Sequence, residues 1–143
     1  MKRVLVIILN YKTYEMTIKL IKELKKLDDA LFDIYVVDNC SPNESADVLK
    51  KESVNLEYHF YKNEKNTGYA AGNNIGIRYA IEMGYDYSLI LNNDLEIIDT
   101  AFIEKLVQVG DKHPNVACIG PKILDIDHHP VAPYCECPRS KRT

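Results

Sequence analysis

Apolar runs alternate with helical patterns along this chain. Five short runs rich in apolar or aromatic residues predict strands, at residues 4–9, 34–37, 56–61, 87–91 and 116–119. Amphipathic spacing and capping signals predict four helices between them, at residues 14–27, 41–51, 70–83 and 99–109. A chain that alternates strands and helices in this way favours an α/β fold, with a mostly parallel sheet and helices on both faces.

Two of the helix starts rest on particular residues. Ser41 and Glu44 have the spacing of a capping box, with Pro42 at the first helical position. Asp99 or Thr100 is expected to cap the last helix.

The pattern stops beyond residue 124. We therefore predict one domain over residues 1–124 and an irregular C-terminal tail over residues 125–143. The tail residues with metal-binding side chains outside the carboxylates are His128, His129, Cys135 and Cys137. Their spacing matches no common zinc site, so we interpret them as a chance grouping. Four cysteines in a chain of this type do not predict a disulfide framework.

Composition limits the possible functions. The chain has 143 residues, 46% of them hydrophobic and 27% charged, which is ordinary for one soluble globular domain. Its net charge of −3 does not favour nucleic acid as a partner, because phosphate contacts require a broad basic face. No apolar run approaches the about 20 residues of a membrane span, and no cleavage site follows the first run. We therefore expect a cytoplasmic protein without a transmembrane segment. Peripheral contact with a membrane remains compatible with this composition.

The candidate chemistry lies just after two of the predicted strands. Asp38 and Asn39 follow the second strand, and residues 92–94, Asn-Asn-Asp, follow the fourth. Because the carboxyl ends of parallel strands face the ligand crevice, we expect Asp38 and Asp94 to converge on one pocket. Asp38 could accept from the imide N–H of a uracil or thymine ring, or from ribose hydroxyls. The alternative is that Asp38 and Ser41 only cap the following helix.

Asp94 is the candidate metal ligand. Mg²⁺ and Mn²⁺ take oxygen ligands, and Mg²⁺ usually binds one or two carboxylates together with waters and substrate phosphates. Asp94 fits this role, with Asn92 or a water in place of a second carboxylate, and Glu96 is a further candidate. Such an ion would neutralise charge that develops on a departing nucleoside diphosphate. The alternative is an ordinary Asn-Asp turn after a strand.

A third segment, residues 66–74, combines small residues with asparagines. Gly68 and its neighbours allow the backbone to approach a ligand closely, while Asn66 and Asn74 offer both donors and acceptors. The glycine spacing is neither that of a P-loop nor that of the dinucleotide fingerprint. The alternative is a turn followed by helix packing.

Together these segments resemble the N-terminal half of family 2 glycosyltransferases with the GT-A fold, in particular the rhamnosyltransferase-like branch of bacterial polysaccharide synthesis. The resemblance covers about residues 3–124 and rests on the stretches VLVIILNYK, IYVVDNCSPNES, NEKNTGYAAGNNIGIRYA, YSLILNNDLEI and VACIGPKIL. It implies a GT-A, nucleotide-diphospho-sugar transferase fold, in truncated form. Residues 1–124 would then be the nucleotide-sugar-binding half of such a domain.

The resemblance also implies roles for individual residues. Those implied to bind the nucleotide-sugar are Asn10, Tyr11, Asp38, Asn66, Gly68, Asn74 and Asn93. Among them, Asp38 matches the residue that contacts the base. Residues 92–94 match the Asp-x-Asp metal motif, with Asp94 at its last acidic position and Asn92 departing from the first.

The implied function is transfer of a sugar from a dTDP-, UDP- or GDP-linked donor, with Mg²⁺ or Mn²⁺, to a glycan or lipid-linked acceptor. Such enzymes need a second half that supplies a general base for the acceptor hydroxyl. The only late carboxylates near the predicted edge, Asp125 and Asp127, resemble a linker instead, so we assign no catalytic residue.

Two rival interpretations remain open from the sequence. One is a catalytically inactive chain that acts as a binding or assembly module, since catalysis requires both substrates to be held together. The other is a nucleotidyltransferase, but its triphosphate clamp requires a glycine-rich, basic loop that residues 10–13 do not provide. We also expect self-association or marginal stability, because half of a domain leaves apolar surface uncovered.

Overall fold

The computed structural model describes residues 4–27 and 29–131. Along these residues the elements are β1 (Val4–Asn10), α1 (Tyr14–Leu24), the 3₁₀ helix η1 (Asp29–Leu31), β2 (Phe32–Asp38), α2 (Ser45–Asn55), β3 (His59–Lys62), α3 (Gly68–Met83), β4 (Tyr87–Leu91) and α4 (Phe102–Lys112). Strands and α-helices alternate, as the sequence pattern predicts. In this described part, no helix is long and apolar enough to cross a bilayer.

The four strands form one parallel sheet in the order β3-β2-β1-β4. Strands β2 and β3 are added in sequence on one side of β1, and β4 pairs with the other side of β1. In register, Asn10 pairs with Asp38, and Ile8 pairs with Leu91. The reversal of direction beside β1 is the place where open α/β sheets bind ligands, at the carboxyl ends of the strands.

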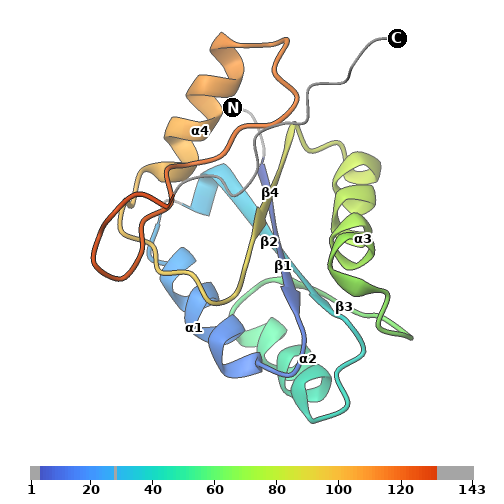
Figure 1. Cartoon of the computed structure of the whole chain (residues 1–143). Helices are drawn as coiled ribbons and strands as arrows, with labels where there is room; N and C mark the ends of the chain where they lie inside the picture. The colour runs from blue at the N-terminus through green and yellow to red at the C-terminus, as the bar shows by residue number, and fades with distance from the viewer. Residues whose placement is uncertain (1–3, 28, 132–143) are drawn as a thin grey trace, which may run out of the picture.

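Helices cover both faces of the sheet (Figure 1). The side chains of β1 alternate between two cores, because successive residues of a strand point to opposite faces. Val4, Val6 and Ile8 pack with α1, α2 and α4 on one face. Leu5 and Ile7 pack with α3 on the other face. The predicted α/β class, with helices on both faces, is therefore confirmed.

Two glycines allow α3 to lie close against β1. A Cβ atom at Gly76 would lie 2.6 Å from Cγ2 of Ile7, and one at Gly72 would lie 2.6 Å from Cδ1 of Leu9. Ile7 is fully buried and branched at Cβ, whereas the half-buried Leu9 presents only the far end of its side chain. The two sites therefore differ in how easily the neighbour can move.

We predict that Gly76→Ala lowers the free energy of unfolding by about 1–3 kcal/mol, the usual cost of overpacking a core. Gly72→Ala is expected to change it by less than about 1 kcal/mol, because Leu9 can rotate and alanine favours the helix. Urea denaturation of the two variants measures the difference. Equal losses, or a larger loss for Gly72→Ala, would contradict this account of the packing.

Most predicted elements are present, with shifted ends. The strand at 87–91 coincides with β4, and the helix at 70–83 begins two residues early, at Gly68. That helix ends at Met83, followed by Gly84 in the left-handed conformation with φ of 75°. The first helix ends at Leu24 rather than at residue 27.

The fifth predicted strand is wrong. Residues 116–119 form no strand in the described chain, although their composition is apolar. A cleft of about 620 Å³, lined by Leu89, Ile103 and Val116 among others, separates this segment from β4. Without a neighbouring backbone to pair with, an apolar run does not become a strand.

The capping box predicted at Ser41 is also wrong. Helix α2 begins only at Ser45, and the side chain of its N-cap residue, Glu44, makes no capping hydrogen bond. The backbone N–H and the hydroxyl of Ser41 both donate to the carboxylate of Asp38 instead. The serine that was expected to start a helix therefore closes the loop after β2.

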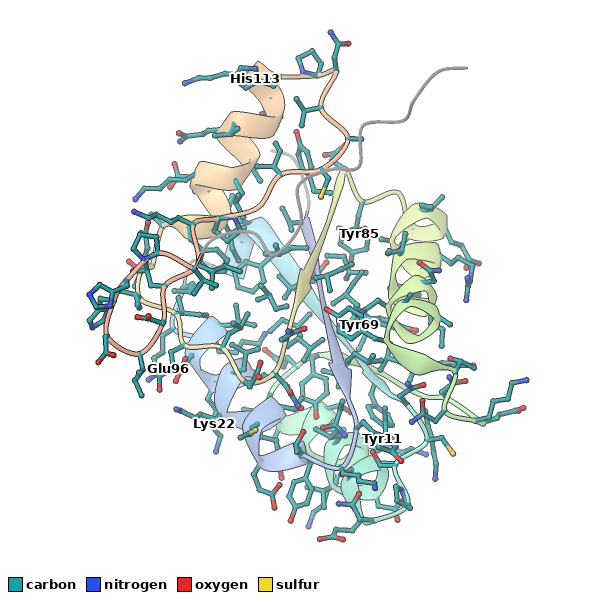
Figure 2. The ribbon with its side chains drawn as sticks, viewed as in Figure 1. Tyr11, Lys22, Tyr69, Tyr85, Glu96 and His113 are labelled. Atoms are coloured by element: carbon teal, nitrogen blue, oxygen red, sulfur yellow. The ribbon has the colours of Figure 1, made fainter. Side chains whose placement is uncertain are left out.

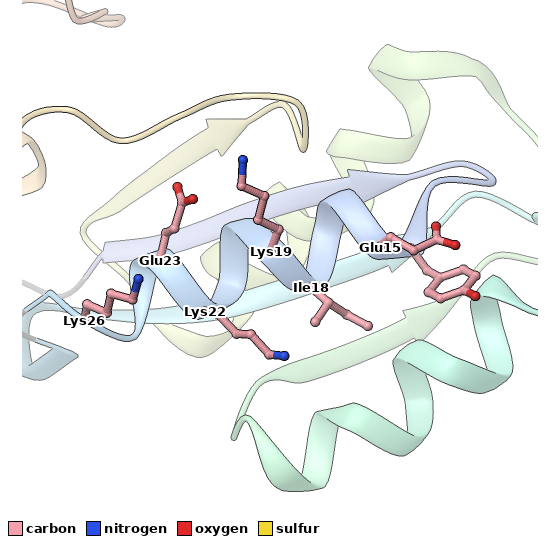
Figure 3. Close-up of a pocket in the computed structure, with 7 residues that line it drawn as sticks. Glu15, Ile18, Lys19, Lys22, Glu23 and Lys26 are labelled. Atoms are coloured by element: carbon pink, nitrogen blue, oxygen red, sulfur yellow. The ribbon is translucent and has the colours of Figure 1, made fainter.

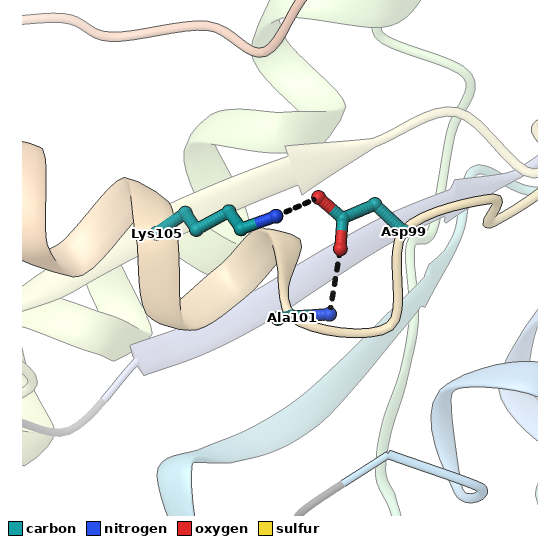
Figure 4. Close-up of polar contacts among 3 residues, drawn as sticks. All are labelled: Asp99, Ala101 and Lys105. Carbon is teal, nitrogen blue, oxygen red and sulfur yellow. Dashed lines mark hydrogen bonds and ion pairs between the residues drawn. The ribbon is translucent and has the colours of Figure 1, made fainter.

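The cap predicted for the last helix is also wrong, because α4 begins at Phe102 with Ala101 at its N-cap and no side-chain capping bond, and Asp99 lies in the turn before it. Its Oδ1 accepts from the N–H of Ala101 at 3.0 Å, and its Oδ2 accepts from Nζ of Lys105 at 2.6 Å (Figure 4). These bonds, that from Lys105 first, hold the pKa of Asp99 below its ordinary value. The two bonds of Asp99 connect the turn before Phe102 to Lys105 in the first turn of α4.

Of the predicted tail, the structure describes residues 125–131. Leu124 and Pro130 form an isolated antiparallel bridge that closes a short loop. Within it, Oδ1 of Asp125 accepts from the N–H groups of Asp127 and His129. Cys135 and Cys137, considered above as metal ligands, lie outside the described residues.

Candidate functional site

The candidate site lies at the carboxyl edge of the sheet. Asn10 ends β1, Asp38 ends β2 beside it, and residues 92–94 follow β4 on the other side. Neighbouring strands are about 4.8 Å apart, so the ends of β2 and β4 lie about 10 Å from each other across β1. The sheet register thus brings to one edge the strand ends that the sequence singles out.

Asp38 is a buried anion satisfied within the chain. It is 0% exposed, and its Oδ1 accepts from Nδ2 of Asn10 at 2.8 Å and from Oγ of Ser41 at 2.6 Å. Its Oδ2 accepts from the backbone N–H of Ser41 at 2.9 Å. A buried carboxylate is tolerated only with such donors. Because this carboxylate is closed to solvent, a nucleotide could reach it only if the surrounding loops moved, so the contact between Asp38 and a base stays a prediction.

A chain of hydrogen bonds continues from Asp38 to the end of β4. Oδ1 of Asn10 accepts from the hydroxyl of Thr17 at 2.9 Å. The oxygen of Thr17 accepts in turn from Nδ2 of Asn93 at 3.0 Å. Asn10 and Thr17 are both 0% exposed, and Asn93 is half-buried. The ends of all three strands are therefore tied together by side chains.

Asn39 ties the loop before α3 to the same edge. Its Oδ1 accepts from Nδ2 of Asn63 at 3.0 Å and from the N–H of Thr67 at 3.3 Å. Its Nδ2 donates to Oδ1 of Asn66 at 3.0 Å and to the carbonyl of Gly68 at 3.3 Å. Two of the predicted residues, Asn66 and Gly68, are thereby fixed to the end of β2.

The loops after β1 and β2 hold two residues in the left-handed region. Lys12 has φ of 69° and Cys40 has φ of 59°. Such a conformation costs a non-glycine residue about 1–3 kcal/mol and persists only where its surroundings impose it. Here the N–H of Lys12 donates to Oγ of Ser41 at 2.8 Å, and Nδ2 of Asn43 donates to the carbonyl of Lys12 at 3.0 Å. The two loops are thus locked to each other.

The outer rim of this edge is exposed. Tyr11 and Tyr69 lie toward the carboxyl ends of the strands, whereas His113 lies at the other end of the molecule (Figure 2). The hydroxyl of Tyr69 donates to Oδ1 of Asn92 at 2.7 Å. Asp94 is exposed beside Asn92. The site therefore consists of a buried polar floor and an accessible rim.

The structure separates the other predicted residues by environment. Asn74 is exposed on α3. Glu96, the further metal candidate, forms an ion pair with Lys19 of α1 at 3.1 Å. Sequence reasoning missed Thr17, Asn63 and any role for Asn39.

The donor set at the end of β4 fits a hard divalent cation. The exposed carboxylate of Asp94 and the amide oxygen of Asn92 are oxygen ligands of the kind that Mg²⁺ and Mn²⁺ prefer. The bond from Tyr69 leaves a second lone pair on Oδ1 of Asn92.

A second group of possible ligands lies in the tail loop. Ligand atoms of Asp125, Asp127 and His129 lie within 4.8 Å of one another, and all three residues are exposed. Both oxygens of Asp125 already face groups of this loop, since Nδ1 of His129 lies 3.7 Å from its Oδ2. This group is an alternative binding site for a metal ion, and a variant of Asp127 distinguishes it from Asp94.

Two hollows elsewhere contain none of the predicted site residues. One runs along the outer side of α1, between side chains that include Tyr14, Ile18 and Lys22 (Figure 3). The other is the cleft between β4 and residues 114–119. The expected single pocket shared by Asp38 and Asp94 is not among these two hollows.

Comparison with known proteins agrees with this arrangement. Residues 5–131 match the family model described as Glycosyl transferase family 2. The chain is 35% identical over 127 residues to the low-salt glycan biosynthesis hexosyltransferase Agl10 of Haloferax volcanii, covering 88% of this chain and 38% of that protein. It is 30% identical over 132 residues to the dTDP-rhamnosyl transferase RfbF of Shigella flexneri, covering 89% of this chain and 44% of that protein. It thus spans about two fifths of the length of these curated relatives.

Solved structures share the fold. TarS of S. aureus, in complex with UDP, superposes with a TM-score of 0.63 at 23% identity, over 80% of this chain and 33% of that chain. The mannosyltransferase PcManGT from Pyrobaculum calidifontis, in complex with GDP-Man and Mn²⁺, superposes with a TM-score of 0.66 at 17% identity, over 74% of this chain and 31% of that chain. At such identities the likeness establishes the fold alone, and the predicted GT-A class is confirmed.

Proposed function

The chain belongs to glycosyl transferase family 2, and from that premise we propose that the carboxyl edge of its sheet binds a nucleotide-diphospho-sugar with a divalent metal ion. The bound sugar would be transferred to a glycan or lipid-linked acceptor. The observation that carries the proposal is the chain of hydrogen bonds from Asp38 through Asn10 and Thr17 to Asn93. It builds a rigid floor beneath an exposed rim at the switch point of the sheet.

The metal ion would be held by Asp94, with the amide oxygen of Asn92 as a further ligand. Mg²⁺ or Mn²⁺ bound there would offset the charge of the two phosphates. PcManGT is recorded with Mn²⁺, which supports the choice of cation. The residues of the chain itself contribute binding and orientation, since the rigid floor fixes where the rim side chains lie.

The nucleotide would lie over the ends of β1 and β2. Tyr11 is 41% exposed directly after Asn10 and offers an aromatic surface for a base or ribose. Asn66, Gly68 and Asn74 stand where the diphosphate-sugar would pass. RfbF is a dTDP-rhamnosyl transferase, and the similar structures include TarS in complex with UDP and PcManGT in complex with GDP-Man. The donor candidates for this chain are therefore dTDP-, UDP- and GDP-sugars.

The proposed contribution of this chain to the reaction is donor binding. It spans 38% and 44% of the two curated relatives, and the acceptor hydroxyl requires a general base that we do not assign among the described residues. For this chain we therefore propose binding of the donor. Transfer of the sugar would require a longer protein that also holds the acceptor.

Calorimetric titration with UDP, dTDP and GDP, each with and without Mn²⁺, tests the proposal. At least one nucleotide should bind saturably, and Mn²⁺ should strengthen that binding by about tenfold or more, because an ion held by Asp94 would offset the charge of the phosphates. The corresponding nucleoside serves as the control, since it lacks both phosphates and should gain nothing from Mn²⁺. Absence of saturable binding for all three nucleotides would refute the proposal.

A further inference from the structure

We propose that Thr17 is a positioning residue for the metal-binding end of β4. Through Asn93, its hydroxyl holds the segment that carries Asn92 and Asp94 in place relative to the buried Asp38. The metal role of that segment rests on the proposed function. The positioning itself is a property of this chain that can be measured without any ligand.

The direction of the hydrogen bonds gives Thr17 its role. Nδ2 of Asn10 donates to Asp38, so Oδ1 of the same amide must accept, and it accepts from the hydroxyl of Thr17 at 2.9 Å. Having given its single proton to Asn10, the oxygen of Thr17 can only accept from Nδ2 of Asn93, at 3.0 Å. Every donor in this series points toward the carboxylate. The buried charge of Asp38 therefore sets the orientation of all of the amides up to Asn93.

The location of Thr17 fits this role better than simple packing. The other buried residues of α1 are Leu20, Ile21 and Leu24, whereas Thr17 is polar and 0% exposed. A threonine inside a helix can donate to the carbonyl four residues earlier, but that contact, to Thr13, is long at 3.4 Å. The shorter bond goes to Asn10. The hydroxyl is therefore used between elements, not within the helix.

The chain itself offers a matched control. Nδ2 of Asn93 also donates to Oγ1 of Thr13, at 2.8 Å. Thr13 is exposed, and this bond leads no further toward Asp38. Thr13→Val and Thr17→Val therefore each remove one bond to Asn93, and only the second cuts the link to the buried carboxylate.

Backbone ¹⁵N relaxation by NMR, without ligand, tests the positioning directly. Thr17→Val should lower the order parameters of residues 92–94 by about 0.15 or more, on a scale where rigid backbone has about 0.85 and flexible backbone less than about 0.6. Thr17→Ser, which keeps the hydroxyl, should restore the wild-type values, and Thr13→Val should change them by less than about 0.05. Unchanged order parameters in Thr17→Val, or an equal change in Thr13→Val, would overturn the proposal.

Asn93→Ala keeps the test decisive if Thr17→Val does not fold, because it cuts the same link from its half-buried end. It should lower the order parameters of residues 92–94 at least as much as Thr17→Val, because it also removes the bond to Thr13. In the double variant the effects should not add, because both changes remove the bond between Thr17 and Asn93. Full additivity, or wild-type order parameters in Asn93→Ala, would overturn the positioning role.

Nucleotide titration then separates this inference from the proposed function. In Thr17→Val, binding of the preferred nucleotide without Mn²⁺ should stay within about twofold of wild type, while the gain from Mn²⁺ should fall by about fivefold. Equal weakening with and without Mn²⁺ would show a merely structural role. If the wild-type chain binds no nucleotide while the variants show the expected order parameters, the proposed function is refuted and the positioning of residues 92–94 is established.

Discussion

Replacing Asp38 with alanine is expected to lower the free energy of unfolding by about 3–5 kcal/mol, at about 1–3 kcal/mol for each buried donor left without an acceptor. The reason is that three donors lose their acceptor at once. They are Nδ2 of Asn10, the backbone N–H of Ser41 and the hydroxyl of Ser41, all in a site closed to solvent. A domain of this size has about 5–15 kcal/mol in total, so the variant should be close to unfolding. Urea or thermal denaturation followed by circular dichroism measures the loss.

Two further variants show whether the loss comes from the buried acceptor. Asp38→Asn keeps one oxygen for Asn10 and the Ser41 hydroxyl but turns an N–H₂ group toward the backbone N–H of Ser41. We expect it to lose about 2–3 kcal/mol, between wild type and alanine. Asp99→Ala removes an exposed aspartate that also accepts two bonds, and it should cost clearly less than either. If Asp38→Ala unfolds at the same denaturant concentration as Asp99→Ala, the carboxylate does not hold the strand ends together.

Replacing Asp94 with alanine is expected to remove most of the gain that Mn²⁺ gives to nucleotide binding, a loss of at least about tenfold. In the proposed site the exposed carboxylate would be the charged ligand at the end of β4, and the amide of Asn92 alone would bind a divalent cation weakly. Because Asp94 is exposed on the rim, the variant should unfold close to the wild-type denaturant concentration. Titration of wild type and variant with the preferred nucleotide, at fixed Mn²⁺, measures the effect.

Asp127→Ala is the matched control for that experiment. Asp127 is also an exposed aspartate, and it belongs to the rival group with Asp125 and His129. Its replacement should leave Mn²⁺-dependent nucleotide binding within about twofold of wild type. A tenfold loss in Asp127→Ala together with wild-type behaviour in Asp94→Ala would move the metal site to the tail loop.

The sequence predicts the order of elements well because most strands and helices are periodic and locally consistent. Residues 87–91 form β4 with the predicted bounds, and Gly84 ends α3 as its backbone freedom allows. Residues 116–119 have the same apolar character but lie beside a cleft, with Val116 51% exposed. Local composition does not reveal whether a pairing strand is near, and that depends on the tertiary fold.

The positions of the predicted strand ends indicate correctly which edge of the sheet carries the polar residues, but they do not indicate which of these residues are buried. They place Asn10, Asp38 and residues 92–94 at one edge, and the sheet register confirms this. They do not show that Asp38 turns inward, because the donors that hold it include Asn10, from a strand 28 residues earlier. The capping prediction at Ser41 failed for the same reason, since Asp38 takes both of its donors.

Thr17 could have been found from the sequence. It lies three and four residues before Leu20 and Ile21, on the apolar side of α1, where a polar residue needs a partner in the core. Asn39 could not, because its partners Asn63 and Asn66 lie in a loop with no periodic signal. A polar residue on an apolar stripe is thus a readable signal of an inter-element bond, whereas loop-to-loop bonds require the folded structure.

Paramagnetic broadening by Mn²⁺ in NMR spectra tests the central claim most directly, namely that the carboxyl edge of this sheet holds a nucleotide and a metal ion. With sub-stoichiometric Mn²⁺ and the best-binding of UDP, dTDP and GDP, we predict that the amide signals of residues 92–94 and 10–13 broaden first. Broadening that begins at Asp125, Asp127 and His129, or that leaves residues 92–94 sharp, would contradict it.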